Sequence, residues 1–241
     1  MAQESGRTAG RALKRIFKQD DILGRIRQQP ASFSLLMNPT RLNIFIYLCQ
    51  NPCDHTRSIA RNIGSLTTVN WHLKQLLEHG YVEAKVVNQK KLYWPKGMLL
   101  DNDLELIGCM RKDLARKIIG TISQKGEIRQ KEIVKTLGVR QQNIDFWLLK
   151  MMDCGLIVKK GQGIGATYAI SKESAKKVKR YDEKARAFSM TIMQLLHNDG
   201  LMPEKKRYKG TRLSVQVNLP DGKRRIHIEC SPMAAIRRYV R

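Results

Sequence analysis

Acidic residues are scarce in this chain of 241 residues: Asp and Glu total 21 against 45 Lys and Arg, which leaves a formal charge of +24. Such an excess predicts an anionic partner, and nucleic acid and an acidic membrane surface are the two candidates. No stretch approaches the roughly 20 apolar residues that a membrane-spanning helix needs, and residues 1–10 are polar with no apolar segment behind them. We therefore expect a soluble, cytoplasmic protein without a membrane partner.

Cysteines are few as well, and the five present are scattered and odd in number, which argues against a disulfide framework and indicates a reducing compartment. Cys49, Cys53 and His55 form a C-x3-C-x-H pattern, but a closed zinc site needs a fourth ligand, and Cys49 lies in an apolar helical stretch. We therefore predict no metal and assign Cys49 to the core. No arrangement of catalytic residues stands out, so we predict neither an enzyme nor a cofactor.

An apolar pattern occurs twice, in Asn38–Met98 and in Arg111–Ser171. In the first half of each copy the offset is 74 residues and pairs Ile59 with Ile133, whereas in the second half it is 75 and pairs Trp71 with Phe146. The first copy thus lacks one residue between Gly64 and Val69. A repeat of this kind predicts two similar structural units.

Each copy predicts the order helix, helix, helix, strand, turn, strand. Asn38-Pro39 is a typical helix start, with Asn as N-cap and Pro at the first helical position. Gly64 is expected to end the second helix, and Ser65 to cap the third. Two strands follow around Asn88-Gln89-Lys90, and the second copy has its own pair around Gly161–Gly165. This order is that of a helix-turn-helix with a β-hairpin wing.

Three segments of the first copy, NPTRLNIFIYL, SIARNIG and TVNWHLKQLLEHGYV, carry a family resemblance. With them Asn38–Met98 resembles the winged helix-turn-helix of archaeal transcription regulators related to the ArsR and MarR groups. Arg111–Ser171 resembles it more faintly, and the two copies cover about half of the chain. The family usually has one more residue in the turn before the third helix, which the second copy has and the first lacks. The resemblance implies a DNA-binding transcription regulator.

The third helix of each copy is expected to enter the major groove. Thr, Asn and Gln side chains there can bond base edges, and the positive helix N-terminus favours phosphate. The candidate DNA-binding residues are Ser65, Thr67, Thr68, Asn70, Trp71 and Lys74 in the first copy, and Arg140, Gln141, Gln142 and Asn143 in the second.

The wings add Lys90 and Lys91 in the first copy and Lys159 and Lys160 in the second, which we expect along phosphates. The alternative is that the polar helix residues form an ordinary solvated face, and that the wing lysines only block edge pairing between strands.

The repeat copies define two winged helix domains, at 38–100 and 101–171. A basic segment at 1–37, helical over Ala9–Gln29, precedes them. A long helix at 172–202 and a basic C-terminal part at 203–241 follow them. The long helix carries an apolar stripe from Val178 to Leu195 that predicts a dimer seam, although it would also fit packing on its own winged domain. Beyond Pro203 we expect a basic linker, EKKRYKG, then a hairpin around Pro220-Asp221-Gly222 and a short helix. The sequence assigns this part no definite role; its basic residues, further candidates for phosphate contact, are Lys205, Lys206, Arg207, Lys223, Arg224 and Arg225.

The sequence thus predicts a mainly α fold with small β-hairpins (α+β): two tandem winged helix-turn-helix domains, a long helix, and a C-terminal β-hairpin plus helix. The predicted function is that of a sequence-specific transcription regulator that binds double-stranded DNA as a homodimer. Two alternatives stay open: a winged-helix scaffold that binds transcription or RNA-processing machinery, and an architectural nucleic-acid binder without sequence preference.

Overall fold

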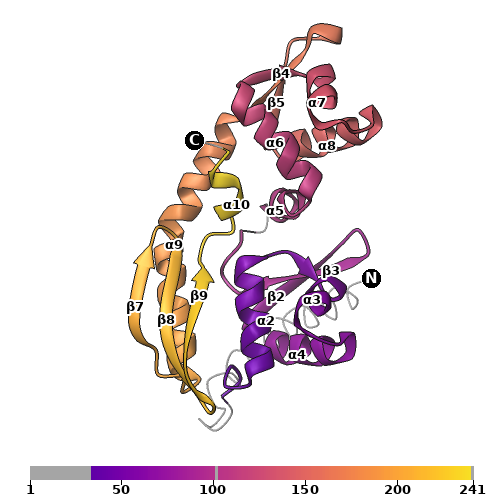
Figure 1. Cartoon of the computed structure of the whole chain (residues 1–241). Coiled ribbons are helices and arrows are strands. Elements are labelled where there is room, and N and C mark those ends of the chain that lie inside the picture. Colours follow the sequence, from indigo (N-terminus) through magenta and orange to yellow (C-terminus); the bar gives the residue numbers. More distant parts are fainter. Residues whose placement is uncertain (1–33, 101–102, 240–241) are drawn as a thin grey trace, which may run out of the picture. The chain divides into compact units, whose positions relative to one another are not determined.

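The computed structural model of the chain describes residues 34–100 and 103–239. They form a mixed α+β fold in which helices pack against small, three-stranded antiparallel sheets (Figure 1). None of the helices in these residues has the length and apolar character that crossing a membrane requires. The helix predicted for Ala9–Gln29 lies outside the described residues.

The first set of elements begins with the helix that Asn38-Pro39 predicts. The Asn38 side chain accepts a hydrogen bond from the backbone N–H of Arg41 at 3.1 Å, and Pro39 occupies the first helical position, where no N–H partner is needed. In chain order the elements are α2 (Pro39–Gln50), β1 (Asp54–His55), α3 (Thr56–Ile63), α4 (Leu66–Glu78), β2 (Val82–Val87) and β3 (Lys90–Pro95).

The second set repeats this order and also the order of strands within the sheet, which is β1-β3-β2 in the first set and β4-β6-β5 in the second. The paired apolar positions Ile59 and Ile133 are both buried, whereas the paired Trp71 and Phe146 are both exposed. After α5 (Leu104–Met110), the elements are α6 (Asp113–Lys125), β4 (Glu127–Arg129), α7 (Gln130–Leu137), α8 (Gln141–Asp153), β5 (Ile157–Lys160), the 3-10 turn η2 (Gly163–Gly165) and β6 (Thr167–Ile170).

The first copy has one residue fewer than the second because its turn between the second and third helices is shorter. Gly138 ends α7 in the left-handed region, with φ of 62°, and two further residues precede α8. Gly64 instead has φ of 164°, which is extended, and Ser65 alone separates it from α4. Both turns connect the second helix to the third, but they differ in length and in the backbone conformation of the glycine.

The C-terminal part differs from its prediction. The segment EKKRYKG is not a linker but forms an edge strand that pairs antiparallel with the first strand of the predicted hairpin. The hairpin itself is confirmed, with Leu219 paired to Gly222 across a two-residue turn. The elements are α9 (Lys172–Asn198), β7 (Glu204–Lys209), β8 (Arg212–Leu219), β9 (Gly222–Glu229) and α10 (Ala234–Arg237).

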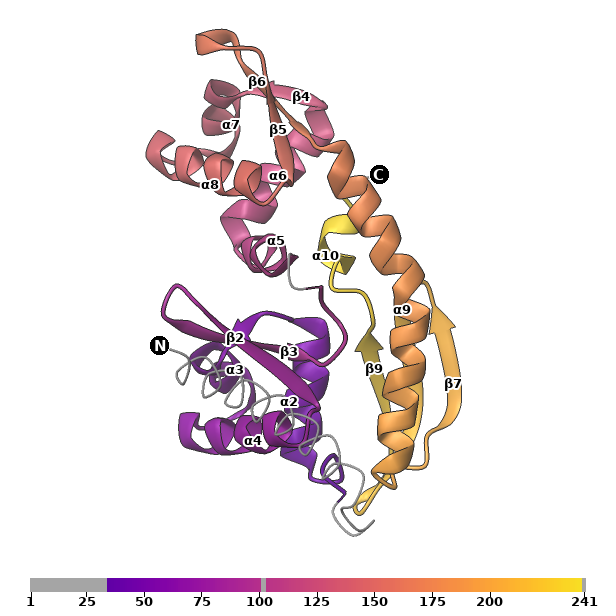
Figure 2. The same cartoon turned by 180° about the vertical axis from the view of Figure 1, so that it is seen from behind.

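The long helix α9 packs within its own chain along the β7–β8–β9 sheet (Figures 1 and 2). Ala185, Phe188 and Ile192 join a core that also holds residues of α2, α4 and the inner face of the sheet. Val178 and Tyr181 join a second core with α5, α6 and α8. The prediction that this stripe forms a dimer seam is therefore wrong, because the stripe is already buried.

Two buried carboxylates tie successive segments together. Asp54, fully buried in β1, forms an ion pair with Arg111, which precedes α6. Asp103, just before α5, contacts Lys177 of α9 at 2.8 Å and accepts a hydrogen bond from the Tyr181 hydroxyl at 2.9 Å. A buried carboxylate is costly unless it has such partners, so these contacts help fix how the segments join.

Candidate nucleic-acid interface

The first turn of α4 presents the polar side chains that the sequence analysis selected. Ser65 caps the helix, because its hydroxyl accepts a hydrogen bond from the Thr68 backbone N–H at 3.1 Å and lies 2.7 Å from the Thr68 hydroxyl. Thr67 and Asn70 are exposed, and their side chains form no hydrogen bond within residues 34–100 and 103–239. Ser65 and Thr68 therefore hold the helix end in shape, whereas the hydrogen-bonding groups of Thr67 and Asn70 have no partner within the described residues.

The opposite face of α4 is anchored in the core. Val69, Leu73 and Leu76 are buried, which is the burial that the helical spacing predicts. Amphipathic burial of this kind fixes the rotation of the helix. The polar residues of its first turn and Lys74 consequently face solvent.

Trp71 is the large apolar side chain on the outer face of α4, with 54% of its surface exposed. The His72 ring meets it edge-on, with the ring centroids 4.8 Å apart, and the Arg41 guanidinium lies 5.8 Å from its centroid. Burial, followed by the charge of Arg41, lowers the pKa of His72. His72 is therefore a neutral support for Trp71 near pH 7, not a cationic phosphate ligand.

The outer face of α8 is more apolar than that of α4. Arg140, Gln141, Gln142 and Asn143 are all exposed at its start. Farther along, Phe146 is 53% exposed and Leu149 58% exposed, and Asp145 is engaged by the Gln130 side chain. Phe146 matches Trp71, but Leu149 stands where the first copy has Lys74. Sequence periodicity did not single out Leu149, because an apolar side chain is usually assigned to the core.

The two wings present their lysines differently. Lys90 and Lys91 are exposed in β3, directly after a two-residue turn in which Asn88 and Gln89 have φ of 48° and 61°. The turn predicted as Asn88-Gln89-Lys90 is thus shorter by one residue.

In the second wing Lys159 is exposed without an acidic partner in the described part of the chain, whereas Lys160 forms an ion pair with Glu127 of β4. The sequence pattern did not distinguish these two lysines. Of these two lysines, Lys159 alone has no acidic partner in the described residues.

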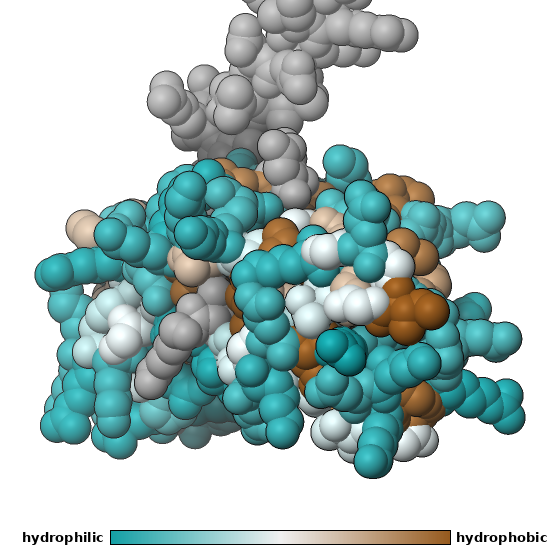
Figure 3. Space-filling view, turned by 90° about the horizontal axis from the view of Figure 1, so that it is seen from above, coloured by the Kyte–Doolittle hydropathy of each residue, from teal (hydrophilic) through white to brown (hydrophobic). Residues whose placement is uncertain are grey.

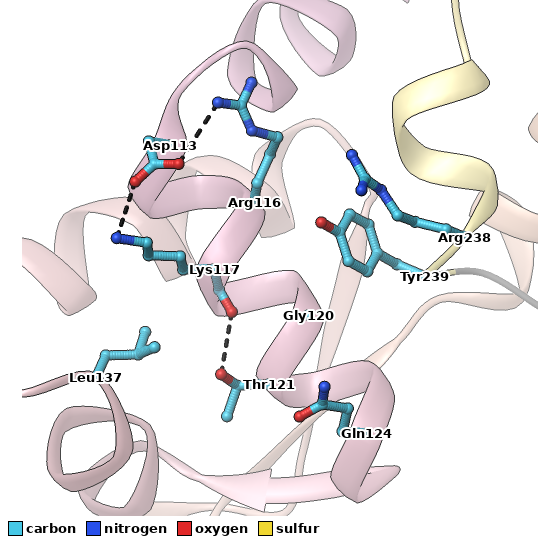
Figure 4. A pocket seen from close by; sticks show the side chains of 9 residues that line it. All are labelled: Asp113, Arg116, Lys117, Gly120, Thr121, Gln124, Leu137, Arg238 and Tyr239. Carbon is cyan, nitrogen blue, oxygen red and sulfur yellow. Dashed lines mark hydrogen bonds and ion pairs between the residues drawn. The ribbon is translucent and has the colours of Figure 1, made fainter.

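The pocket beside α6 does not have the lining of a typical small-molecule site. It has a volume of about 500 Å³ and is lined mainly by polar and charged groups, among which Asp113 contacts Lys117 at 3.0 Å and Arg116 at 3.5 Å (Figure 4). Ligand pockets are usually apolar with a few polar groups, which this one is not. No group of three or more His, Cys, Asp or Glu in the described part of the chain could hold a metal ion.

The face drawn in Figure 3 is hydrophilic over most of its area, with hydrophobic residues in small separate patches. Cys49, which the sequence analysis assigned to the core, is fully buried in the hydrophobic core.

A relative of the chain carries the name of a helix-turn-helix protein. A protein of Methanocaldococcus jannaschii, named an uncharacterized HTH-type transcriptional regulator, is 27% identical over 143 residues, or 59% of this chain and 36% of that protein. The chain therefore matches little more than a third of that relative's length. No family model matches.

Among solved structures, the homodimeric winged helix-turn-helix DNA-binding domain of a Mycobacterium bovis protein is 25% identical. The match covers 45% of this chain and 87% of that domain, with a TM-score of 0.24.

Proposed function

We propose that the chain is a double-stranded DNA-binding transcription regulator with two winged helix-turn-helix units in tandem, at 38–100 and 101–171. The observation that carries the proposal is the first turn of α4, where Thr67 and Asn70 are exposed and unbonded on a helix whose other face is buried. The similarity to an archaeal HTH-type transcriptional regulator supports the same function. The chain's charge of +24 suits a polyanionic ligand.

In this mechanism α4 enters the major groove and reads sequence. Asn70 contacts a base edge, preferably adenine, which offers an acceptor and a donor that match an amide, and Thr67 contacts a neighbouring base. Trp71 packs against a thymine methyl group. Lys74, which forms an exposed ion pair with Glu78 at 3.7 Å, exchanges it for phosphate. Lys90 and Lys91 of the wing contact the backbone and fix the register without reading sequence.

The second unit binds through the start of α8, with Gln141, Gln142 and Asn143 as base readers and Arg140 at phosphate or guanine. Lys159 is its phosphate contact, since Lys160 is paired within the chain. We further propose a homodimer, which would place reading helices on two half-sites. Its interface lies outside the α9 stripe, which packs inside the chain.

The test compares Asn70→Ala with Lys90→Ala on a selected duplex and on random duplex over a range of salt concentrations. Asn70→Ala should reduce the preference for the selected site by about 1–3 kcal/mol, the usual value of a good base contact. Lys90→Ala should weaken binding to all duplexes alike and lower the salt slope by about 0.9. Lys135→Ala, an exposed lysine of α7, is the matched control. Equal losses on both duplexes for Asn70→Ala would contradict base reading.

A second candidate function, a scaffold for transcription machinery, is favoured by one observation. The exposed Phe146 and Leu149 give α8 a face that resembles a protein contact more than a groove reader. Phe146→Gln combined with Leu149→Gln separates the two functions. The variant should weaken duplex binding if α8 reads DNA, and unchanged duplex binding would assign α8 to a protein partner.

A further inference from the structure

The sheet formed by β7, β8 and β9 has one buried face and one open face. Four residues of β8 alternate inward and are buried: Leu213, Val215, Val217 and Leu219. Residues opposite one another in an antiparallel pair point to the same face. Ser214 and His227 therefore share the outer face, as do Gln216 and Arg225. The inner face packs on α2 and α9, so the outer face is a supported, pre-formed surface.

This sheet is strongly cationic. Its exposed basic residues are Lys205, Lys206, Arg207, Lys209, Arg212, Lys223, Arg224 and Arg225. Within the described residues only Lys223 among them contacts a carboxylate, that of Glu204 at 3.1 Å. Arg224 lies opposite the buried Val217 and so belongs to the inner side of the sheet. The other six unpaired charges repel one another and weaken the folded state unless an anion is bound. The arrangement is therefore typical of a surface that binds a polyanion.

Lys205 adds a second and independent observation. The pairing of β7 with β8 shifts between Glu204 and Arg207, so that Lys205 and Lys206 form a bulge. Lys205 has φ of 46° there, in the left-handed region that glycine adopts without strain and other residues do not. Its side chain is exposed and makes no ion pair in the described part of the chain. A lysine held against its backbone preference indicates a role for its charge.

We propose that the outer face of the β7–β8–β9 sheet binds the phosphate backbone of double-stranded DNA, as a contact separate from α4 and the wings. The inference rests on the proposed function only in taking the same duplex as ligand. Proteins that bind single strands stack bases on aromatic side chains. The outward positions of β8 and β9 instead hold cations, hydroxyls and amides, with His227 as the sole ring and Glu229, which accepts a hydrogen bond from the Ser231 N–H, as the sole carboxylate. Such side chains suit phosphate and sugar contacts.

The sharpest test is Lys205→Gly, measured on random-sequence duplex. Glycine suits the left-handed bulge, so the unfolding temperature should be no lower than that of the wild type. Binding should nevertheless weaken, and the slope of log affinity against log salt should fall by about 0.9. A stable variant with an unchanged slope would overturn the assignment of Lys205.

A triple variant tests the face as a whole. Arg207→Gln, Arg212→Gln and Arg225→Gln together should lower the salt slope by about 2.7, three times the value for one phosphate. The control variant, Lys125→Gln with Lys172→Gln and Lys179→Gln, loses the same charge from exposed positions off the sheet and should keep the slope. Equal slopes for the two triple variants would refute the proposal.

The remaining measurements separate this inference from the proposed function. Because random duplex carries no operator, the slope does not depend on base reading by α4, and Asn70→Ala should leave it unchanged. Binding to single-stranded RNA and to vesicles of anionic phospholipid is measured in parallel. If the sheet variant loses either of these but keeps its duplex slope, the sheet serves another anion and the proposal is wrong.

If the triple variant does not fold, acetylation of the wild-type protein replaces it. Lys205, Lys206 and Lys209 should react more slowly with an acetylating reagent once duplex is added, and unchanged reactivity would overturn the proposal.

Discussion

Replacing Arg111 with methionine should show how much the ion pair between Arg111 and the buried Asp54 carboxylate contributes to the free energy of unfolding. Asp54 is fully buried, forms an ion pair with Arg111, and accepts a hydrogen bond from the Tyr47 hydroxyl at 2.7 Å. Removing one partner of a buried ion pair costs about 3–5 kcal/mol, because the remaining charge is left without compensation. Arg111 keeps 22% of its side chain exposed, and the Tyr47 bond survives. We therefore expect the lower end, about 3 kcal/mol at pH 7.

The pH dependence has a defined sign. Burial acts to raise the pKa of Asp54, but hydrogen bonds from Arg111 and Tyr47 and the charge of Arg111 outweigh it and hold the pKa below its usual range. Asp54 therefore stabilises the wild type above the unfolded pKa of about 3.9, and this contribution is lost as pH falls through the folded value. In Arg111→Met the burial effect prevails and raises the pKa. The difference in stability between the two proteins should thus narrow as pH falls below about 5.

Urea denaturation of both proteins between about pH 3 and pH 8 measures this difference. Arg180→Met is the matched control, because Asp103 keeps Lys177 at 2.8 Å after Arg180, itself half exposed, is removed. It should cost no more than about 1 kcal/mol. A loss for Arg111→Met that equals the control, or one that grows toward low pH, would refute the reasoning.

Three further changes test the helix cap, the second core and the wing. Ser65→Ala removes the acceptor at the start of α4 and should lower the free energy of unfolding by about 1 kcal/mol, while Ser65→Asp keeps an acceptor and should lose less in the same denaturation assay. Ile133→Ala opens a cavity in the second core and should cost about 2–5 kcal/mol by urea denaturation; a loss under about 1 kcal/mol would place Ile133 outside a packed core. Lys159→Met should weaken duplex binding more than Lys160→Met in a salt titration, because Lys160 is paired with Glu127, and equal losses would contradict the role of that pair.

The features that the sequence predicted correctly are set by local chemistry. Asn38-Pro39 begins a helix because the Asn side chain bonds the Arg41 N–H, and Ser65 begins another in the same way. The outward position of Asn70 follows from helical spacing alone, since Val69 and Leu73 fix the buried face. Such features need no knowledge of the rest of the chain.

The features that the sequence did not predict depend on distant partners. β1 has two residues and β4 has three, and each is a strand only because it pairs with a strand some forty residues later. β7 reads as a charged linker and becomes an edge strand because β8 beside it is anchored in the core. An edge position tolerates its lysines, which also protect the edge from pairing with other chains. The pairing of Lys160 with Glu127 is non-local for the same reason.

The apolar stripe of α9 shows how such a partner can be found from sequence. The sequence analysis assigned the stripe to a second subunit and gave the alternating apolar residues of β8 and β9 no partner. A lone hairpin is not stable in water, and a long helix in water must cover its apolar stripe. Each apolar face therefore covers the other, and Ile192, Val215 and Ile226 belong to one core. Packing within a chain avoids the entropy loss of association. When a sequence predicts two uncovered apolar faces, their packing against each other is therefore a better prediction than contact with a second subunit.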